Sequence, residues 1–162
     1  MQIQYRGSDN FDIKLKDTIL KLGSRVSIDD FVLPGPGEYE KRGISVFAIP
    51  DDQNIIYTIH AEEMTLCFLG HLSRDLNEEE TKQIGNVDIL FLPLGAENTI
   101  ELKKALNILS KIDPRVVIPM LYTDIEEFKK SEGVADGEFD VLKIKKSDLP
   151  DEQRALFVLK AC

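Results

Sequence analysis

The chain has 162 residues, a formal net charge of −9, 43% hydrophobic residues and 30% charged residues. These values are typical of an ordinary globular protein, so we expect a single domain over residues 1–162. The acidic balance argues against nucleic acid and anionic membranes as partners, because both bind Lys and Arg. No apolar run is long enough to span a bilayer, and the segment after Met1 has no signal-peptide pattern, so we expect a cytoplasmic protein.

The first half of the chain is expected to consist of strands. Apolar residues alternate with polar ones from Phe11 to Leu15, which is the period of a half-buried strand. Gly23–Asp30 is expected to be irregular, and Pro34–Gly37 is expected to be a rigid turn. The same patterns predict further strands over Thr18–Leu22, Ile44–Ile49, Ile55–Ala61 and Met64–Leu69. The strand Ile44–Ile49 is expected to end at Pro50.

The second half alternates between strand and helix patterns. Asn77 and Glu80 have the spacing of a capping box, and the helix that they begin should end at Gly85. Thr99 is the expected cap of a second helix, whose apolar face includes Leu102 and Leu109. The remaining expected elements are strands over Val87–Leu92, Val116–Ile118, Phe139–Ile144 and Ala155–Leu159, and a short helix over Asp124–Glu132. This order predicts two sheets with helices outside them.

Four blocks of sequence, in order along the chain, carry a resemblance to one known family. They are MQIQYRGSDNF from Met1 to Phe11, GPGEYE with RGI from Gly35 to Ile44, LGHL with IGNVDILFLPLG from Leu69 to Gly95, and DPRVVIPMLY from Asp113 to Tyr122. Together they resemble small bacterial proteins of the metallo-β-lactamase fold, relatives of L-ascorbate-6-phosphate lactonase. The resemblance implies an αββα sandwich with helices on both outer faces. It also implies descent from hydrolases that use zinc or manganese to activate a water molecule.

The positions at which the family holds its metal carry other residues here. The interval from Leu22 to Leu33 should contain the family's His-x-His-x-Asp-His loop, but it has no histidine. Gly7-Ser8-Asp9 stands where the family has Gly-His-Ser, His71 replaces the bridging aspartate, and Leu121 replaces the final histidine. A ligand is also missing at Ala48–Pro50. The resemblance therefore implies a degenerate member without a metal site, and we expect no cofactor.

The resemblance places Ser8, Asp9, His71 and Tyr122 around the former active-site edge, where they are the candidates for a vestigial cleft. The chain has only two histidines, His60 and His71, so a site with several histidines cannot be built. A zinc site needs three or four converging ligands. Ser8, His71 and Asp9 also permit a catalytic triad, but a triad requires Ser–His and His–Asp hydrogen bonds and an oxyanion hole.

Three hypotheses of function follow from the sequence. The leading one is a non-catalytic protein that acts in binding or assembly, as a homo-oligomer or with an active relative. The second is a metal-dependent hydrolase with a rearranged zinc or manganese site that uses His71, Asp9 and Glu97 or residues of a partner chain. The third is a protein that binds a small ligand in the emptied cleft. Cys67, within an apolar strand, is expected to act as a small buried hydrophobe rather than as a nucleophile.

Overall fold

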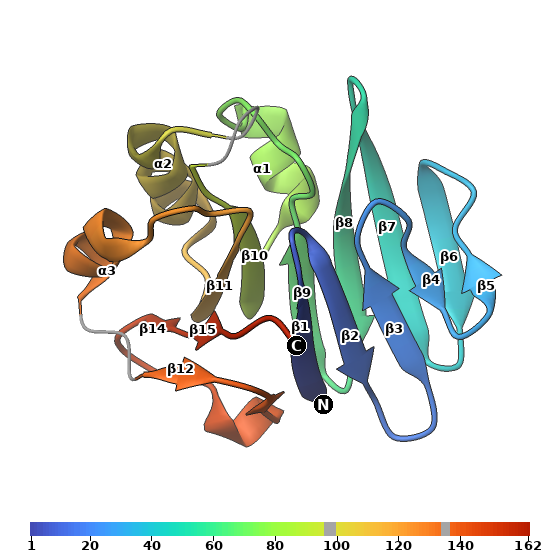
Figure 1. Ribbon diagram of the computed structural model, residues 1–162. Helices are drawn as coiled ribbons and strands as arrows, with labels where there is room; N and C mark the ends of the chain where they lie inside the picture. The colour runs from blue at the N-terminus through green and yellow to red at the C-terminus, as the bar shows by residue number, and fades with distance from the viewer. Residues whose placement is uncertain (96–99, 134–136) are drawn as a thin grey trace.

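The computed structural model describes residues 1–95, 100–133 and 137–162. Two sheets pack face to face, and helices lie beside the second sheet (Figure 1). The first sheet has the strand order β13-β1-β2-β3-β4-β5, made of β1 (Gln2–Gly7), β2 (Asn10–Lys14), β3 (Ile19–Leu22), β4 (Ser27–Ile28), β5 (Phe31–Val32) and β13 (Leu142–Lys143). All five pairings within it are antiparallel.

The second sheet is mixed, with the strand order β14-β11-β10-β9-β8-β7-β6. Its strands are β6 (Gly37–Lys41), β7 (Ile44–Asp51), β8 (Asn54–Ala61), β9 (Met64–Phe68), β10 (Ile89–Pro93), β11 (Val116–Met120) and β14 (Ala155–Leu156). β9, β10 and β11 are parallel neighbours, so their carboxyl ends meet at one edge of the sheet. A separate pair joins β12 (Glu138–Phe139) to β15 (Val158–Leu159).

The described residues form three α-helices, which are α1 (Glu78–Ile84), α2 (Leu102–Ile112) and α3 (Glu126–Glu132). The capping box of Asn77 and Glu80 is formed, and it satisfies backbone amides at the start of α1. Helix α1 ends before Gly85 as expected, and the Gly85 amide donates to the Thr81 carbonyl. The N-cap position of α2 is Glu101. The expected cap Thr99 lies outside the described residues. No helix in the described ranges is long and apolar enough to cross a membrane.

The molecule has two hydrophobic cores, and they explain the layers. The first lies between the sheets, where Phe11 from the first sheet contacts Phe91 from the second with ring centroids 4.8 Å apart. The second lies between the outer face of the second sheet and the helices, and includes Ile84, Leu109 and Phe128. All three described helices therefore cover the second sheet (Figure 1).

The metallo-β-lactamase-like sandwich is confirmed, but the expected helical layer on both outer faces is not. In the described part of the chain the outer face of the first sheet carries exposed side chains, including Gln2, Lys14 and Lys21, and no α-helix packs there. The interval that was expected to contain the family's metal-binding loop folds into the short strands β4 and β5. One outer face of the sandwich is therefore open to solvent.

Several element boundaries differ from those expected. Strand β7 continues through Pro50 to Asp51, because Pro50 is exposed near the hairpin end, where the strand tolerates a missing amide. The segment Gly23–Asp30, expected to be irregular, contains β4. The expected strand Phe139–Ile144 is divided between β12 and β13, which belong to different sheets.

Candidate functional site

The turn between β1 and β2 lies against the carboxyl ends of β9 and β11. The backbone amide of Leu121, which follows β11, donates to the Ser8 carbonyl over 3.1 Å. The imidazole Nε2 of His71, which follows β9, lies 3.0 Å from Oδ2 of Asp9. Ser8, Asp9, His71 and Leu121, which the resemblance places at the family's metal-binding edge, thus lie together in the structure.

Asp9 and His71 form a hydrogen-bonded pair with unequal exposure. Asp9 is only 4% exposed, whereas the His71 side chain is 50% exposed. Burying a carboxylate lowers the stability of the folded protein unless the carboxylate is hydrogen-bonded. His71 supplies one hydrogen-bond partner of Asp9. In this arrangement the carboxylate orients the ring while much of the imidazole remains in contact with solvent.

Two asparagine side chains hold this pair in place. Asn10 Nδ2 donates to Asp9 Oδ1 over 3.3 Å. Asn54 Oδ1 accepts from the His71 backbone amide over 3.0 Å, and Asn54 Nδ2 donates to the Leu69 carbonyl over 2.9 Å. Asn54 thereby fixes the chain just before and at His71. Asn10 is the sequence neighbour of Asp9, but no pattern singled it out. Asn54 was not predicted because it acts from the start of β8, 15 and 17 positions away from its partners along the chain.

Glycines make room for both asparagines. A Cβ atom on Gly70 would lie 2.3 Å from Asn54 Oδ1, and a Cβ on Gly23 would lie 2.4 Å from Asn10 Oδ1. Real Cβ atoms do not approach other atoms so closely. Gly70 also has a φ of +59°, a backbone conformation that disfavours other residues. The segment around His71 is therefore shaped by close backbone approach to Asn54.

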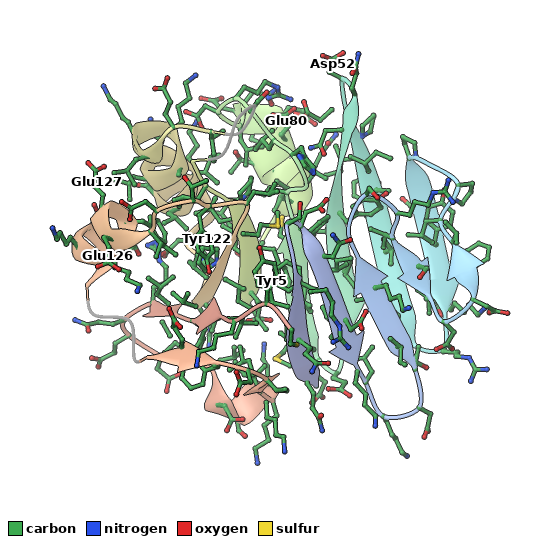
Figure 2. All side chains as sticks on the ribbon, in the orientation of Figure 1. Tyr5, Asp52, Glu80, Tyr122, Glu126 and Glu127 are labelled. Carbon is green, nitrogen blue, oxygen red and sulfur yellow. The ribbon has the colours of Figure 1, made fainter. Side chains whose placement is uncertain are left out.

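Tyr122 follows Leu121, whose backbone amide donates to the Ser8 carbonyl. Tyr122 is near Tyr5 (Figure 2), and the Tyr5 hydroxyl also donates to the Ser8 carbonyl over 2.8 Å. Burial, and then the proximity of Tyr122, raise the pKa of Tyr5 to about 12, and burial raises the pKa of Tyr122. Both phenols therefore remain protonated at neutral pH. Of the four predicted cleft residues, Ser8, Asp9 and His71 come together, while Tyr122 stands beside Tyr5.

A small pocket opens beside the Asp9–His71 pair. Its volume is about 240 Å³, and its lining includes Asn54, Tyr57, Phe68, Gly70 and Ser24 in addition to that pair. This is slightly below the ~300–1,000 Å³ of typical small-molecule sites. The pocket has space for a compact ligand and offers it one imidazole, amide groups and two aromatic rings.

The donor set does not fit a zinc ion. Zinc in proteins takes at least three protein ligands. Asp9 and His71 supply two, and they are already bonded to each other. Among the residues that the structure describes, no group of three His, Cys, Asp or Glu side chains has the arrangement of a metal site. Glu97, which the hydrolase hypothesis adds, lies outside the described residues.

The geometry does not support two other kinds of catalysis, a Ser–His–Asp triad at Ser8 and a cysteine nucleophile at Cys67. Within the described part of the chain, the Ser8 side chain forms no hydrogen bond with His71, so the first bond of a Ser–His–Asp triad is missing. Cys67 is fully buried, and burial raises the pKa of its thiol, which makes the thiolate scarce. The described geometry therefore does not set up Ser8 or Cys67 as a nucleophile.

Arg74, three residues after His71, ties the segment after β9 to two neighbouring elements. Its guanidinium bonds to Asp51 at the end of β7 and to Glu80 in the first turn of α1, with Nη2–Oε1 at 2.5 Å and Nη1–Oε2 at 2.9 Å. The Asp51 and Glu80 carboxylates are buried. These contacts hold the pKa of Glu80 below its usual value, chiefly through the Arg74 hydrogen bonds.

A two-sheet sandwich with helices on its mixed sheet, and with polar side chains gathered at the carboxyl ends of its parallel strands, is the architecture of a hydrolase-like protein of the metallo-β-lactamase fold. The sequence agrees, because the family model of the beta-lactamase superfamily domain matches residues 9–121. The chain therefore belongs to the beta-lactamase superfamily.

Individual relatives extend this result. The chain is 40% identical over 55 residues to UPF0173 protein PF0020 of Pyrococcus furiosus, a match over 31% of this chain and 26% of that protein. It thus spans about a quarter of the length of that curated relative. The TM0207 structure from Thermotoga maritima superposes with a TM-score of 0.84 at 20% identity, over 98% of both chains. Igni18 of Ignicoccus hospitalis gives 0.65 at 13% identity, over 89% of this chain and 99% of Igni18.

Proposed function

We propose that this chain is a non-catalytic member of the superfamily that acts in binding or assembly, with a second copy of itself or with an active relative. The main observation behind this proposal is the set of side chains that follow β1, β9 and β11, where the ends of these strands lie together. An apolar residue, Leu121, and a hydrogen-bonded Asp9–His71 pair lie where the sequence resemblance implies that the family's metal ligands converge. The family's chemistry depends on a water molecule activated by a bound metal ion. Among the described residues, no group of side chains has the arrangement needed to bind that ion.

The open face of the first sheet supports the second half of the proposal. Ile19, Phe31 and Val32 of this sheet are 43%, 40% and 47% exposed, although they are large apolar residues. Strand β5 is also an unpaired edge of the sheet. Exposed apolar groups and open edges are features through which sheet proteins associate.

The second candidate is a metal-dependent hydrolase with a rearranged site. The Asp9–His71 pair favours it, because imidazole and carboxylate are both zinc ligands. The names of TM0207 and Igni18 describe a zinc-dependent hydrolase and a metallo hydrolase. At such low identity these names support the fold alone, so this candidate depends on a third ligand that the described residues do not supply.

A hydrolysis assay separates the two candidates. The wild-type protein and the His71→Ala variant are incubated with lactone, phosphodiester and β-lactam substrates, with added zinc or manganese. We expect no turnover above the metal-containing buffer for either protein. Turnover that is present in the wild type and lost in His71→Ala would contradict the proposal. The Lys103→Gln variant, altered on the exposed side of α2, serves as a matched control for sample quality.

A further inference from the structure

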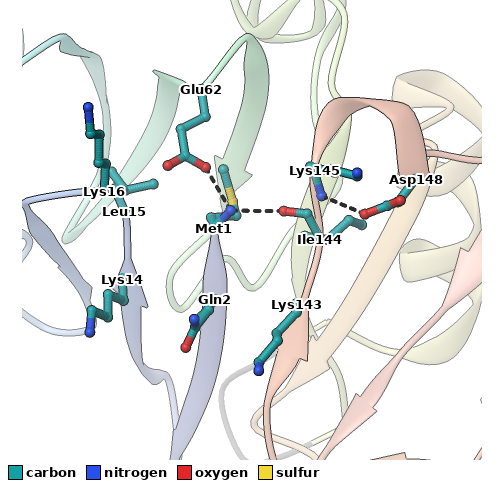
Figure 3. Close-up of a pocket in the computed structure, with 10 residues that line it drawn as sticks. All are labelled: Met1, Gln2, Lys14, Leu15, Lys16, Glu62, Lys143, Ile144, Lys145 and Asp148. Atoms are coloured by element: carbon teal, nitrogen blue, oxygen red, sulfur yellow. Dashed lines mark hydrogen bonds and ion pairs between the residues drawn. The ribbon is translucent and has the colours of Figure 1, made fainter.

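A second concave region lies at the opposite end of the strands from the Asp9–His71 pair. Gln2 begins β1, whereas Ser8 and Asp9 follow its end, and Glu62 precedes β9, whereas His71 follows it. The groove is about 500 Å³ and is lined by Gln2, Glu62 and four lysines, Lys14, Lys16, Lys143 and Lys145 (Figure 3). We call it the lysine groove. It shares no lining residue with the pocket beside His71.

Strand register fixes the arrangement of the lysines. Gln2 of β1 pairs with Lys14 of β2 on one side and with Lys143 of β13 on the other. Neighbouring strands lie about 4.8 Å apart, so the two lysine backbones are about 10 Å apart with Gln2 between them. Figure 3 shows Lys14 and Lys143 on either side of Gln2. Both flanking strands are antiparallel to β1, so they run in the same direction.

The same direction of β2 and β13 places two further lysines beyond the first pair. Lys16 lies just beyond the end of β2 and Lys145 just beyond the end of β13. All four lysines are exposed, while Leu15 and Ile144 between them are buried in the core. The four lysine side chains thus line the groove from the ends of two strands that run in the same direction. None of the three described α-helices contributes a lining residue, so the groove is open to a ligand.

The charges in the lysine groove are not balanced from within. None of the four lysines forms an ion pair with any side chain in the described ranges. Two acidic side chains, Glu62 and Asp148, also line the groove, so the four lysines leave it with an excess of positive charge. Glu62 accepts from the Met1 amino group over 2.7 Å, and Asp148 accepts from the Lys145 backbone amide over 3.0 Å. A chain with a net charge of −9 thus concentrates positive charge at one concave site.

We propose that the lysine groove binds a small anion with several negative charges, of the class of phosphate esters and polyphosphates. Ammonium groups bind phosphate oxygens through charge-assisted hydrogen bonds, and several together match a multivalent anion. The volume is that of a small-molecule site. Nucleic acid fits less well, since a long polyanion would extend past the groove onto a surface whose overall charge repels it.

Pyrophosphate titration by isothermal calorimetry at constant ionic strength tests the proposal, on protein from which any affinity tag has been removed. We expect saturable binding to the wild type, and a loss of affinity of about tenfold or more in the Lys14→Gln/Lys143→Gln double variant. The matched control is Lys103→Gln/Lys104→Gln, which removes two exposed lysines of α2 and should bind as the wild type does.

Three results would overturn the proposal. They are no saturable binding of pyrophosphate, an equal loss of affinity in the control double variant, and tight binding of a single-stranded oligonucleotide without binding of pyrophosphate. The inference does not depend on the proposed function. The His71→Ala variant should retain pyrophosphate binding, so a failure at one end of the strands is distinguishable from a failure at the other.

Discussion

Replacing Arg74 with alanine is expected to lower the free energy of unfolding by on the order of 3 kcal/mol. Arg74 bonds to both Asp51 and Glu80, whose carboxylates are buried. Without the guanidinium, two neighbouring negative charges stay out of water with no cationic partner. The Arg74 side chain is itself 44% exposed, so the cost comes from the two buried carboxylates, which lose their cationic partner and remain poorly solvated.

The control for this prediction is Arg6→Ala. Arg6 also bonds to a carboxylate, that of Asp12, over 2.8 Å, but both partners are substantially exposed. Exposed pairs contribute at most about 1 kcal/mol. Urea unfolding followed by circular dichroism measures both variants. Equal, small effects in the two variants would show that the Arg74 network does not stabilise the fold.

The effect of Arg74→Ala should also depend on pH. Arg74 holds the pKa of Glu80 below its usual 4.5, so ionised Glu80 stabilises the folded state at pH values above 4.5. This contribution is lost as the pH falls through the lowered pKa of Glu80. In the variant, protonation of Glu80 removes one of the unpaired charges. The stability difference between wild type and variant should therefore be constant near neutral pH and shrink in acid.

Replacing Gly70 with alanine is expected to destabilise the protein by about 2 to 4 kcal/mol. The new Cβ would lie 2.3 Å from Asn54 Oδ1, and the φ of +59° is strained for alanine. Asn54 must then move and give up its bonds to the His71 amide and the Leu69 carbonyl. The substitution should therefore disturb the segment that carries His71 as well as lower stability.

Gly43→Ala separates the two causes. Gly43, in the turn between β6 and β7, also has a positive φ, +74°, but no atom lies within 4 Å of the position where its Cβ would be. It therefore tests backbone strain without the steric clash. We expect Gly70→Ala to be more destabilising than Gly43→Ala by at least about 1 kcal/mol, the value of a lost hydrogen bond. Equal midpoints in urea would mean that the contact with Asn54 is not important.

Much of the fold was predictable because its long elements carry strong local patterns. The alternation around Phe11 gave β2, the continuous apolar run from Met64 gave the central strand β9, and Asn77 with Glu80 gave the start of α1. Two-residue strands such as β4 and β5 have no such pattern. They exist only because neighbouring strands supply partners, which the local sequence does not show.

The candidate site was predictable in part. The family resemblance placed Asp9 and His71 at one edge, and the structure brings them to 3.0 Å. The supporting residues were not found, because Asn54 reaches His71 across 17 positions of sequence from another strand. The open outer face of the first sheet was likewise missed. The resemblance implied helices on both sides, and only the packing of the two cores shows where the described helices lie.

Metal content tests the central claim most directly. Protein purified without a polyhistidine tag is dialysed to equilibrium against zinc or manganese, and bound metal is measured by inductively coupled plasma mass spectrometry. We expect far less than one metal ion per chain, and the same value for His71→Ala, because Asp9 and His71 alone do not complete a site. About one tightly bound ion per chain in the wild type, lost in His71→Ala, would contradict the account.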